Sequence, residues 1–546
     1  MRRLLLLLPL AGALSWCEPR EAADTVLVNG KVVTLSAEGA IVEAIAVKEG
    51  RILAAGTTDE VLAYVGPATE RIDLEGKTVV PGLADNHYHG IGGGPGVDLS
   101  RTRSLQEVLD AIAARAKETP EGEIIVTNSD WHEGQLKETR LPYRDDLDSA
   151  TSRHPVVAVR GGHEYILNSA ALAKWGIDEK VEAPAGGSIG RYPDGRLNGE
   201  LVDTAKDFVV LPPRPQPSED DRIRKMVEEY RRLNEAGLTS IRYGSASPSL
   251  YRDLLEIQKR GELSLRMSLL LRISDRAGLE GLNIAPDEGN AWVRIAGIKL
   301  GVDGGFEGGL MREPYEEPLG SDGTFFGLQT MATEPYIELV RELNRRGWRI
   351  ATHAVGDAAI DLVLDAYEKA NEERSISTRR FTIEHGFIPR EDHFARMKEL
   401  GVHVAAQNHL YLAAPSLVKY WGPDRAKWVT PLRAYLDAGI PVSLGTDSPV
   451  VPYPPLWVLY HFITRDTISA GVMGEDQKVG REEALRAMTS GNAELTFEET
   501  VRGTLEGGKF ADLVVLEEDF LTCEPERIRD MEVSLTMVGG RIVFRR

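Results

Sequence analysis

The stretch Pro-Gly-Leu-Ala-Asp-Asn-His-Tyr-His-Gly, residues 81–90, overlaps an apolar run at residues 79–84 that has the composition of a β-strand. In an extended segment, residues i and i+2 point to the same side, so the imidazoles of His87 and His89 can converge on one ion. Alone, such a pair is weak evidence for a metal site, because two polar residues in an exposed loop show the same spacing. Its meaning depends on where the other ionisable residues of the chain lie.

Strand-like and helical segments alternate through the middle of the chain, with helical patterns at residues 336–346 and 358–370 among them. Such alternation predicts parallel strands joined by helices, and eight units predict an α/β fold of the (β/α)₈ TIM-barrel type. The eight runs predicted as barrel strands are residues 79–84, 238–243, 265–271, 295–300, 348–352, 381–384, 402–406 and 441–445.

Ionisable side chains end four further strands of this predicted barrel. Lys299 ends the fourth strand, His353 the fifth, His385 the sixth and Asp447 the eighth. Barrel enzymes place their chemistry at the C-terminal ends of the strands. Buried charges that are neither paired nor bound to metal are too costly to serve only the structure. The pattern therefore predicts a metal site at the barrel mouth.

The segment between the first and second predicted strands, residues 91–237, is far longer than one crossover needs. We predict that it forms a cap beside the barrel mouth, inserted into a barrel domain at residues 81–494. Its own predicted strands are residues 123–127 and 156–160, and its predicted helices are residues 105–117 and 220–235.

Both ends of the chain differ in sequence pattern from the middle, because short runs rich in β-branched residues flank turn residues there. Asn29-Gly30 between two such runs is a strong hairpin signal. The matching pattern at the two ends predicts one discontinuous β-sandwich domain, formed by residues 22–80 together with residues 495–546. The predicted hairpins pair residues 25–28 with 31–34, 44–47 with 51–54 and 536–538 with 541–544, and residues 511–516 form a further strand.

The N-terminus predicts an export signal over residues 1–17. Arg2 and Arg3 precede apolar residues 4–16, a run too short for a comfortable membrane span. Cys17 is a candidate lipid anchor, although Trp16 departs from the small residue expected before it, and cleavage without lipidation is the alternative. We therefore expect a periplasmic or extracellular protein, free or tethered as a lipoprotein, without a transmembrane domain.

Composition excludes some partners. Of the 546 residues, 42% are hydrophobic and 27% are charged, which is ordinary for a soluble globular protein. The formal charge of −20 argues against nucleic acid, because a polyanion is held mainly by Lys and Arg. The two cysteines form no CxxC motif, so nitrogen and oxygen must hold any metal. We expect a small-molecule substrate, and a homodimer as the default assembly.

The order His-x-His, Lys, His, His, Asp along the barrel resembles the amidohydrolase superfamily. Within it the chain resembles amidohydrolase family 3, the branch that includes N-substituted formamide deformylases. The likeness covers nearly the whole mature chain, including residues 141–172 of the cap. One departure is the end of the second strand, where Arg242-Tyr243-Gly244 replaces a motif that usually carries Asp. The motifs that carry the resemblance are residues 81–90, 297–304, 384–386 and 503–516.

The resemblance implies one or two divalent metal ions, for which zinc suits the ligand types. The His-x-His pair and Asp447 would hold the more buried ion, and His353 and His385 the second. Lys299 would bridge both as a carbamate formed with CO₂. The full implied ligand set is His87, His89, Lys299, His353, His385 and Asp447.

The bridging role of Lys299 has a physical basis. A lysine ammonium beside two cations would be repelled, whereas a carbamate is an anionic oxygen ligand that both ions attract. The alternative is a lysine at a strand end that pairs with Asp303 or Glu307, in which case the site can still hold a single metal ion.

Two residues are the predicted catalytic groups. By the same resemblance, Asp447 accepts a proton from the metal-activated water and passes it to the leaving group. His163 in the cap is a candidate for polarising the substrate carbonyl, and a purely structural, hydrogen-bonded histidine is the alternative. Asn168 resembles a family position near the substrate, and the role of His409 stays open.

The sequence thus predicts a metal-dependent amidohydrolase that acts on the carbon–nitrogen bond of a non-peptide amide, a formamide or a cyclic amide. One alternative is an esterase or lactonase that uses the same site. Another is a non-catalytic exported protein with a binding or regulatory role. The intact ligand set speaks against the non-catalytic reading, because drift in a degraded enzyme removes ligands first.

Overall fold

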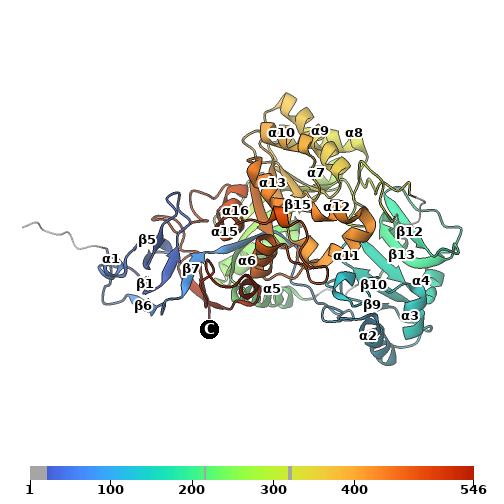
Figure 1. Cartoon of the computed structure of the whole chain (residues 1–546), viewed down its shortest axis with the longest axis horizontal. Coiled ribbons are helices and arrows are strands. Elements are labelled where there is room, and N and C mark those ends of the chain that lie inside the picture. Colours follow the sequence, from blue (N-terminus) through green and yellow to red (C-terminus); the bar gives the residue numbers. More distant parts are fainter. Residues whose placement is uncertain (1–20, 214–216, 318–322) are drawn as a thin grey trace, which may run out of the picture.

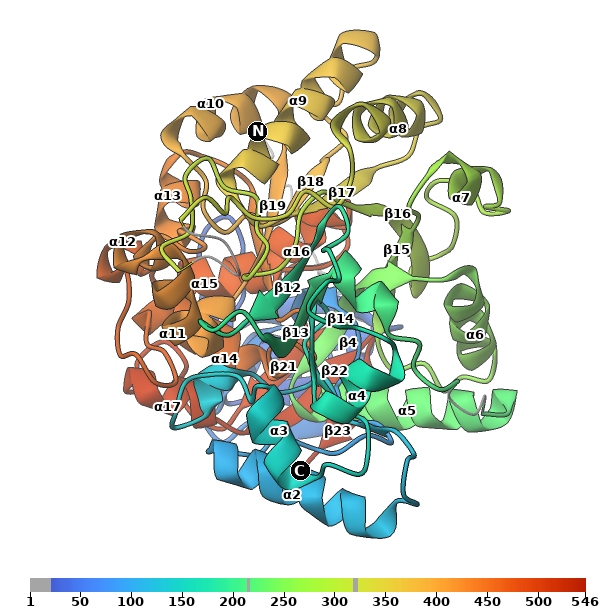
Figure 2. The same ribbon diagram turned by 90° about the vertical axis from the view of Figure 1, so that its right-hand side faces the viewer.

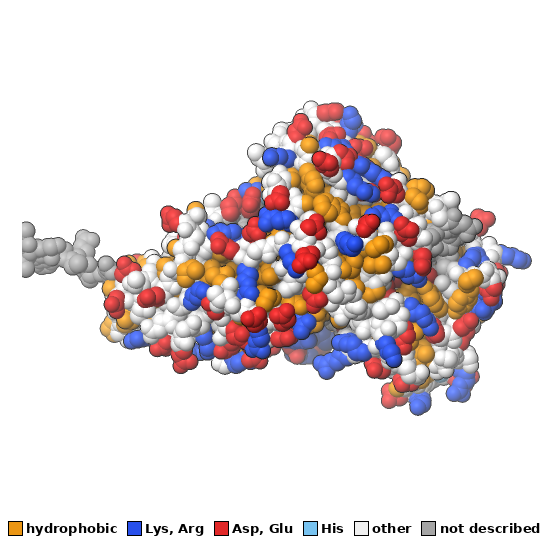
Figure 3. All heavy atoms as spheres, in the orientation of Figure 1, with side chains coloured by type: hydrophobic (Ala, Val, Ile, Leu, Met, Phe, Trp, Pro, Cys, Tyr) orange, Lys and Arg blue, Asp and Glu red, His pale blue; other side chains and the backbone are white. Residues whose placement is uncertain are grey.

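The computed structural model of the chain describes residues 21–213, 217–317 and 323–546. The predicted export signal and Cys17 lie outside the described residues. Within the described ranges, none of the helices combines the length and the hydrophobicity that a bilayer span requires. Three parts follow one another along the long axis in Figure 1, with the β-rich part at one end, the barrel in the middle and the cap at the other end. Acidic and basic side chains are interspersed over the face in Figure 3.

Eight parallel strands form the central sheet, as predicted. Its strand order runs from β20 back to β8 without interruption, and backbone hydrogen bonds from Asp447 to His87 and from His89 to Ser448, each 2.8 Å long, close the barrel between its last and first strands. The strands are β8 (Leu83–Tyr88), β14 (Leu238–Ala246), β15 (Arg266–Arg272), β16 (Val293–Gly301), β17 (Ile350–Ala354), β18 (Thr382–His385), β19 (His403–Gln407) and β20 (Val442–Gly445).

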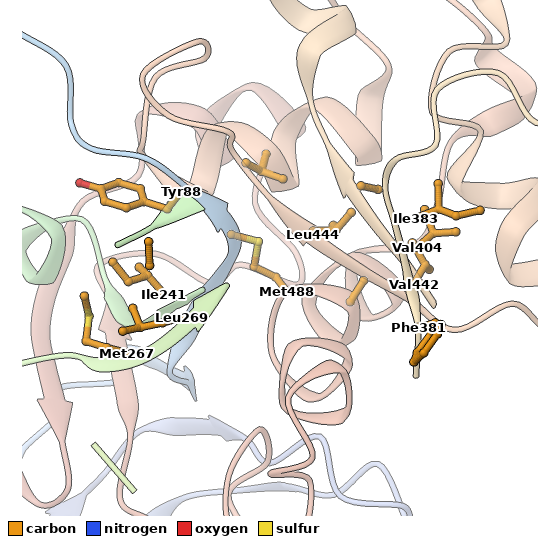
Figure 4. Packing of buried hydrophobic residues seen from close by; sticks show 14 of the residues in the cluster. Tyr88, Ile241, Met267, Leu269, Phe381, Ile383, Val404, Val442, Leu444 and Met488 are labelled. Carbon is orange, nitrogen blue, oxygen red and sulfur yellow. The ribbon is translucent and has the colours of Figure 1, made fainter. Parts of the chain in front are cut away.

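Amphipathic helices cover the outside of this barrel, as Figure 2 shows from the cap side. Apolar residues at helical spacing bury one face of each helix against the strands. In α9, for example, Ile360, Val363, Leu364 and Tyr367 all belong to the main core. Figure 4 shows the barrel part of that core. The main helices are α5 (Glu219–Glu235), α6 (Pro248–Lys259), α8 (Thr333–Arg345), α9 (Asp357–Glu373), α10 (Glu391–Leu400), α11 (His409–Trp421), α14 (Pro455–Thr464) and α15 (Arg481–Met488).

The apolar run at residues 79–84, predicted as one barrel strand, is split between two sheets. Its first half belongs to β7 (Thr78–Pro81), which pairs with β2 (Lys31–Val33) and β21 (Leu513–Leu516) outside the barrel. The barrel strand begins only at Leu83, so His87 lies inside β8 rather than beyond its end. Gly82 makes the passage possible, because a Cβ there would lie 2.2 Å from the hydroxyl oxygen of Thr239.

The cap contains a five-stranded sheet in the order β12-β13-β11-β10-β9. The helix predicted at residues 220–235 is α5, and it lies with the barrel rather than in the cap. Its buried Ile223, Val227 and Leu233 belong to the main core. The cap elements are α2 (Leu105–Glu118), β9 (Ile125–Val126), α3 (Arg144–Ala150), β10 (Val156–Arg160), β11 (Glu164–Leu167), α4 (Ser169–Lys174), β12 (Gly187–Arg191) and β13 (Leu197–Asp203).

The two chain ends share a sheet, as the sequence predicted. A six-stranded sheet has the order β23-β22-β21-β7-β2-β3, and a four-stranded sheet, β5-β4-β1-β6, contains only N-terminal strands. The strands are β1 (Thr25–Val28), β2 (Lys31–Val33), β3 (Ile41–Val42), β4 (Ala44–Lys48), β5 (Arg51–Gly56), β6 (Glu70–Asp73), β21 (Leu513–Leu516), β22 (Val533–Val538) and β23 (Arg541–Arg545).

Two of the three predicted hairpins are confirmed and one is wrong. β4 pairs with β5, and β22 pairs with β23. The strands on either side of Asn29-Gly30 do not pair, because β1 pairs with β4 and β6 whereas β2 pairs with β3 and β7. Asn29 has the positive φ of a tight turn, 59°. The turn passes the chain from one sheet to the other, and Leu27 and Val32 then face the same core between the sheets.

Candidate metal centre

Three possible ligand atoms converge where the last and first barrel strands meet. The Nε2 atoms of His87 and His89 lie 3.0 Å apart. Asp447 Oδ1 lies 3.5 Å from the Nε2 atom of His87 and 3.2 Å from that of His89. Asp447 directs its carboxylate from a left-handed backbone conformation, with φ of 62°. Two imidazoles and one carboxylate around a common point are a suitable donor set for a divalent transition metal.

A buried ion pair fixes the orientation of His87. The ring atom Nδ1 hydrogen-bonds to Glu384 Oε2, and Arg242 donates to the other oxygen of Glu384 at 2.6 Å. Because Nδ1 carries the proton toward the carboxylate, the lone pair of Nε2 points at Asp447 and His89. Burial lowers the pKa of His87 to about 4, so the ring is neutral at physiological pH. A neutral imidazole is the form that binds metal.

Gly244 leaves room for the two candidate ligands of the first barrel strand, His87 and His89. It lies in β14, the strand next to β8. A Cβ at this position would lie 2.8 Å from Nε2 of His87 and 2.9 Å from Cε1 of His89. The departure from the family pattern at Arg242-Tyr243-Gly244 therefore has two structural consequences, since Arg242 anchors Glu384 and Gly244 makes space for the two histidine rings.

Lys299 lies beside the same cluster. It is only 3% exposed, and its Nζ is 3.3 Å from His87 Nε2. Neither partner that the sequence left open for it is paired with it. Asp303 accepts backbone N–H groups from the loops that follow β16 and β17, and Glu307 accepts from Arg160 at 3.0 Å. Burial lowers the pKa of Lys299 to about 8, which favours its neutral amine.

His385 and His353 stand edge to face, with ring centroids 4.6 Å apart. His385 Nδ1 hydrogen-bonds to the Gln407 side-chain oxygen at 2.7 Å, which leaves its Nε2 free to bind an ion. His353 Nε2 instead lies 3.0 Å from the carbonyl oxygen of Gly304. Burial, more than any other cause, holds the pKa of both histidines well below the usual value. Both rings are therefore neutral, but His353 is the predicted ligand that is least converged on the cluster.

His409, whose role the sequence left open, reaches the site. Its Nε2 lies 3.0 Å from Asp447 Oδ2, and its Nδ1 is buried without a partner among the described residues. His385, His409 and Asp447 form a second group of converging ligand atoms. Although burial favours the neutral acid, His87, His409 and His89 hold the pKa of Asp447 well below its usual range. Asp447 is thus a carboxylate at physiological pH, with one oxygen toward each group.

These observations fit a metal ion. The rings of His87 and His385 are neutral and are oriented through Nδ1 by Glu384 and Gln407. Among the described residues, no Lys or Arg forms an ion pair with the Asp447 carboxylate that faces this cluster. Tight clusters of unprotonated donors in a buried site are the usual preparation for a metal. The residues that the structure brings into this centre are His87, His89, Lys299, His385, His409 and Asp447, with His353 beside them.

The centre lies at the floor of a cavity of about 760 Å³ between the barrel and the cap. His163 enters this cavity from the turn between β10 and β11, and its ring stacks on His353 with centroids 5.4 Å apart. Its Nδ1 hydrogen-bonds to Asp203 Oδ1 at 2.6 Å. Burial alone would lower the pKa of His163, but the Asp203 carboxylate outweighs it and raises the pKa.

A family model described as the amidohydrolase family matches residues 70–544 of the chain. The chain belongs to the amidohydrolase family. The N-substituted formamide deformylase of Arthrobacter pascens is 28% identical to this amidohydrolase, over 96% of this chain and 98% of that protein. The protein LONG AFTER FAR-RED 3 of Arabidopsis thaliana is 28% identical, over 98% and 95%. The crystal structure of an uncharacterized metal-dependent hydrolase from Pyrococcus furiosus matches with a TM-score of 0.64 and 28% identity, over 91% of this chain and 100% of that one.

Asn168, a cap residue of this amidohydrolase that the family resemblance placed near the substrate, does not line the cavity. Asn168 is fully buried and caps α4, accepting a hydrogen bond from the backbone of Ala171. Trp131 is also buried and donates its ring N–H to the carbonyl of Val159. His132 begins a short 3₁₀ helix, η1 (Glu133–Gln135), as its capping residue. These three residues hold the cap together and do not line the cavity.

Four residues of the site were not identified from the sequence: Arg242, Glu384, Asp203 and Gln407. A signal existed for the first two, since each is a charged residue inside an apolar strand, where a charge must be paired. No local signal existed for Asp203 or Gln407, because their partners lie 40 and 22 residues away along the chain.

Proposed function

We propose that this amidohydrolase cuts the carbon–nitrogen bond of a non-peptide amide, with N-substituted formamides as the first substrates to test. The observation that carries the proposal is the convergence of two imidazoles, His87 and His89, on the Asp447 carboxylate in the wall of the cavity between the barrel and the cap. Similarity to the formamide deformylase over almost the whole length of both chains supports the choice of bond.

Two groups of residues would hold metal. His87, His89 and Asp447 would bind one divalent ion, for which we propose zinc. His385 and His353 would bind a second ion, and Lys299, as a carbamate, would be a ligand to both ions. The neutral amine that burial favours at Lys299 is the form that reacts with CO₂. When bound, the metal would supply a water nucleophile active near neutral pH and would polarise the scissile carbonyl.

Asp447 would move the proton. Its Oδ1 faces the two first-strand histidines, and its Oδ2 accepts a hydrogen bond from His409. A carboxylate so held can take the proton of the attacking water and return it to the nitrogen of the leaving amine. His409 would keep the carboxylate in the orientation that the transfer needs.

His163 would bind the substrate carbonyl oxygen. With Nδ1 bonded to Asp203, its other ring nitrogen is the atom left to act in the cavity. A raised pKa makes the imidazole a better donor to the negative charge that develops on that oxygen. The stacking on His353 keeps the ring close to the ligand cluster.

Turnover by the Asp447→Asn variant tests this proposal. We expect formate release from N-benzylformamide to fall by at least about 100-fold, because the proton acceptor is lost. The matched control is Asp424→Asn, since the Asp424 side chain is 98% exposed and far from the ligand set in the chain. That control should keep wild-type activity, and circular dichroism should show the same fold for both variants.

A substrate panel identifies the bond. N-formyl amines, N-acyl amines, hydantoins and aryl esters would be compared on metal-loaded protein. We expect hydrolysis of at least one class of amide. Hydrolysis of the esters alone, or no hydrolysis by protein that holds metal, would contradict the proposed function.

A further inference from the structure

Arg272 is a cation at the barrel mouth. It is the last residue of β15, and its register partner on β16 is Lys299. Side chains in register on neighbouring strands point to the same face, so Arg272 projects on the side of the sheet that carries Lys299. It lines the cavity and is exposed there. No hydrogen bond or ion pair joins its guanidinium to any residue in the described ranges.

Arg160 and Lys206, two other cations of the cavity wall, are engaged. Arg160 is buried and bonded to Glu133 and Glu307. Lys206 donates to the carbonyl of Gly162 and lies over the ring of Tyr165 at 5.5 Å. In a chain with 64 basic and 84 acidic residues, a solvent-accessible arginine has many possible partners, so an unpaired one inside a cavity is unusual. The positive charge of Arg272 is thus available to a ligand.

Two serines line the same cavity as Arg272 and lie close to it in the fold. Ser245 lies in β14, one strand from Arg272, and Ser274 follows it by two residues along the chain. Both line the cavity, and neither hydroxyl has a hydrogen-bond partner in the part of the chain that the structure describes. A guanidinium with neighbouring hydroxyl donors is the usual recognition group for a carboxylate or a phosphate.

Part of the remaining wall is apolar. Phe306 and Phe387 stack with ring centroids 5.6 Å apart, and Val355 and Met331 also line the cavity. The wall therefore offers an apolar surface in addition to the candidate metal centre and to Arg272 with Ser245 and Ser274. A substrate that satisfies all three features carries an amide, an acidic group and an apolar side chain.

We propose that Arg272, assisted by Ser245 and Ser274, binds an acidic group of the substrate, and that the substrates are N-formyl or N-acyl amino acids with an apolar side chain. The inference rests on the proposed function. In the reaction, water adds its oxygen to the acyl carbon, the carbon–nitrogen bond breaks, and the amino acid leaves with the second proton of the water on its nitrogen.

Matched substrates test the inference. N-formylphenylalanine and N-phenethylformamide differ only by the carboxylate. We expect wild-type protein to prefer the carboxylate by about 10- to 100-fold in kcat/KM, the range of a charge-assisted hydrogen-bonded pair. Arg272→Met should abolish that preference. Arg276→Met is the control, because Arg276 is exposed on the following helix and pairs with Glu280, and it should leave the preference intact. The phosphonate analogue of the amino acid shows whether the acidic group is a carboxylate or a phosphoryl group.

A binding measurement separates this inference from the proposed function. N-methylsulfonylphenylalanine and N-methylsulfonylphenethylamine have no amide bond to cut, and calorimetry gives their affinities for metal-loaded protein. Tighter binding of the acid that depends on Arg272 supports the inference even if no amide is hydrolysed. Equal affinities of the acid and the neutral compound, or a preference for the acid that survives in Arg272→Met, would overturn it.

Discussion

At the scale of single residues, Gly244 shows how a missing side chain shapes the candidate metal centre. A methyl group there would lie under 3 Å from atoms of His87 and His89. We expect Gly244→Ala to lower bound metal to less than about half of the wild-type content, because the two ligands cannot both keep their positions. Metal analysis of the purified variant measures this.

The control for that variant is Gly507→Ala, where an added Cβ would have no atom within 4 Å. It should bind metal like the wild type. Full metal content in Gly244→Ala would show that the His-x-His pair adapts, or that it is not the ligand pair.

Asp203 is the second residue whose effect can be predicted. It bonds to His163 Nδ1 and also lies against the loop after β16, where a Cβ at Gly304 would meet its Oδ2 at 2.0 Å. We expect Asp203→Asn to lower kcat by about 10- to 100-fold with unchanged metal content, since it acts on the orientation and charge of His163. Asp207→Asn is the comparison, and it should differ little from the wild type. A normal kcat in Asp203→Asn would remove His163 from the proposed mechanism.

Residue types at strand ends predicted much of the site, and the reason is topological. In a barrel, the C-terminal ends of all strands lie at the same mouth. Lys299, His385 and Asp447 could therefore be grouped from the sequence alone. The orientation of each ring could not be predicted, because it depends on distant partners. His353 shows this, since its Nε2 faces the carbonyl of Gly304 rather than the cluster.

At the scale of elements, a buried charge network joins the cap to the barrel. Arg160 in β10 bonds to Glu133 in η1 and to Glu307 in the loop after β16, and Ser416 in α11 bonds to Glu133. The arginine and both glutamates are at most 3% exposed. The cap is therefore held over the cavity by paired charges that water does not screen.

We predict that Arg160→Met destabilises the protein by about 3–5 kcal/mol, because it leaves buried carboxylates without their cation. The midpoint of urea denaturation measures the change. Arg153→Met is the control, because that side chain is 71% exposed, and it should shift the midpoint little. An unchanged midpoint in Arg160→Met would show that the network contributes no net stability.

The boundaries of a strand were predictable where the whole apolar run belongs to a single sheet. Residues 156–160 coincide with β10, whereas the run at residues 79–84 passes from β7 to β8. Hydrophobic pattern alone does not reveal such a transfer, since both sheets bury the run. The hairpin predicted around Asn29-Gly30 was wrong for a similar reason. The turn residues determine the bend, but the packing of the two sheets determines which strand pairs with which.

At the scale of the whole molecule, the β-sandwich and the barrel are joined by a buried ion pair. Arg266 at the start of β15 donates to Asp512 at 2.7 and 3.1 Å, and Asp512 also accepts from the backbone of Gly539. The guanidinium lies 3.8 Å from the ring centre of Phe510. The C-terminal part of the β-sandwich thus contacts the barrel through an ion pair that is shielded from water.

We predict that Asp512→Asn lowers the Tm of the whole protein, because it leaves Arg266 buried without a counter-charge, at a cost of about 3–5 kcal/mol. Calorimetry should show a single unfolding transition that moves to lower temperature as a whole. The control is Asp530→Asn, whose side chain is 60% exposed. A separate early transition, with the rest of the curve unchanged, would mean that the sandwich unfolds independently of the barrel.

The central claim is that hydrolysis depends on metal held at the barrel mouth. The most direct measurement is the rate of formate release from an N-substituted formamide as a function of metal bound per chain, on protein stripped with a chelator and reloaded in steps with zinc. We predict a rate that rises with bound metal and extrapolates to zero for the stripped protein. A rate that stays the same in the stripped and the fully loaded protein would contradict the claim.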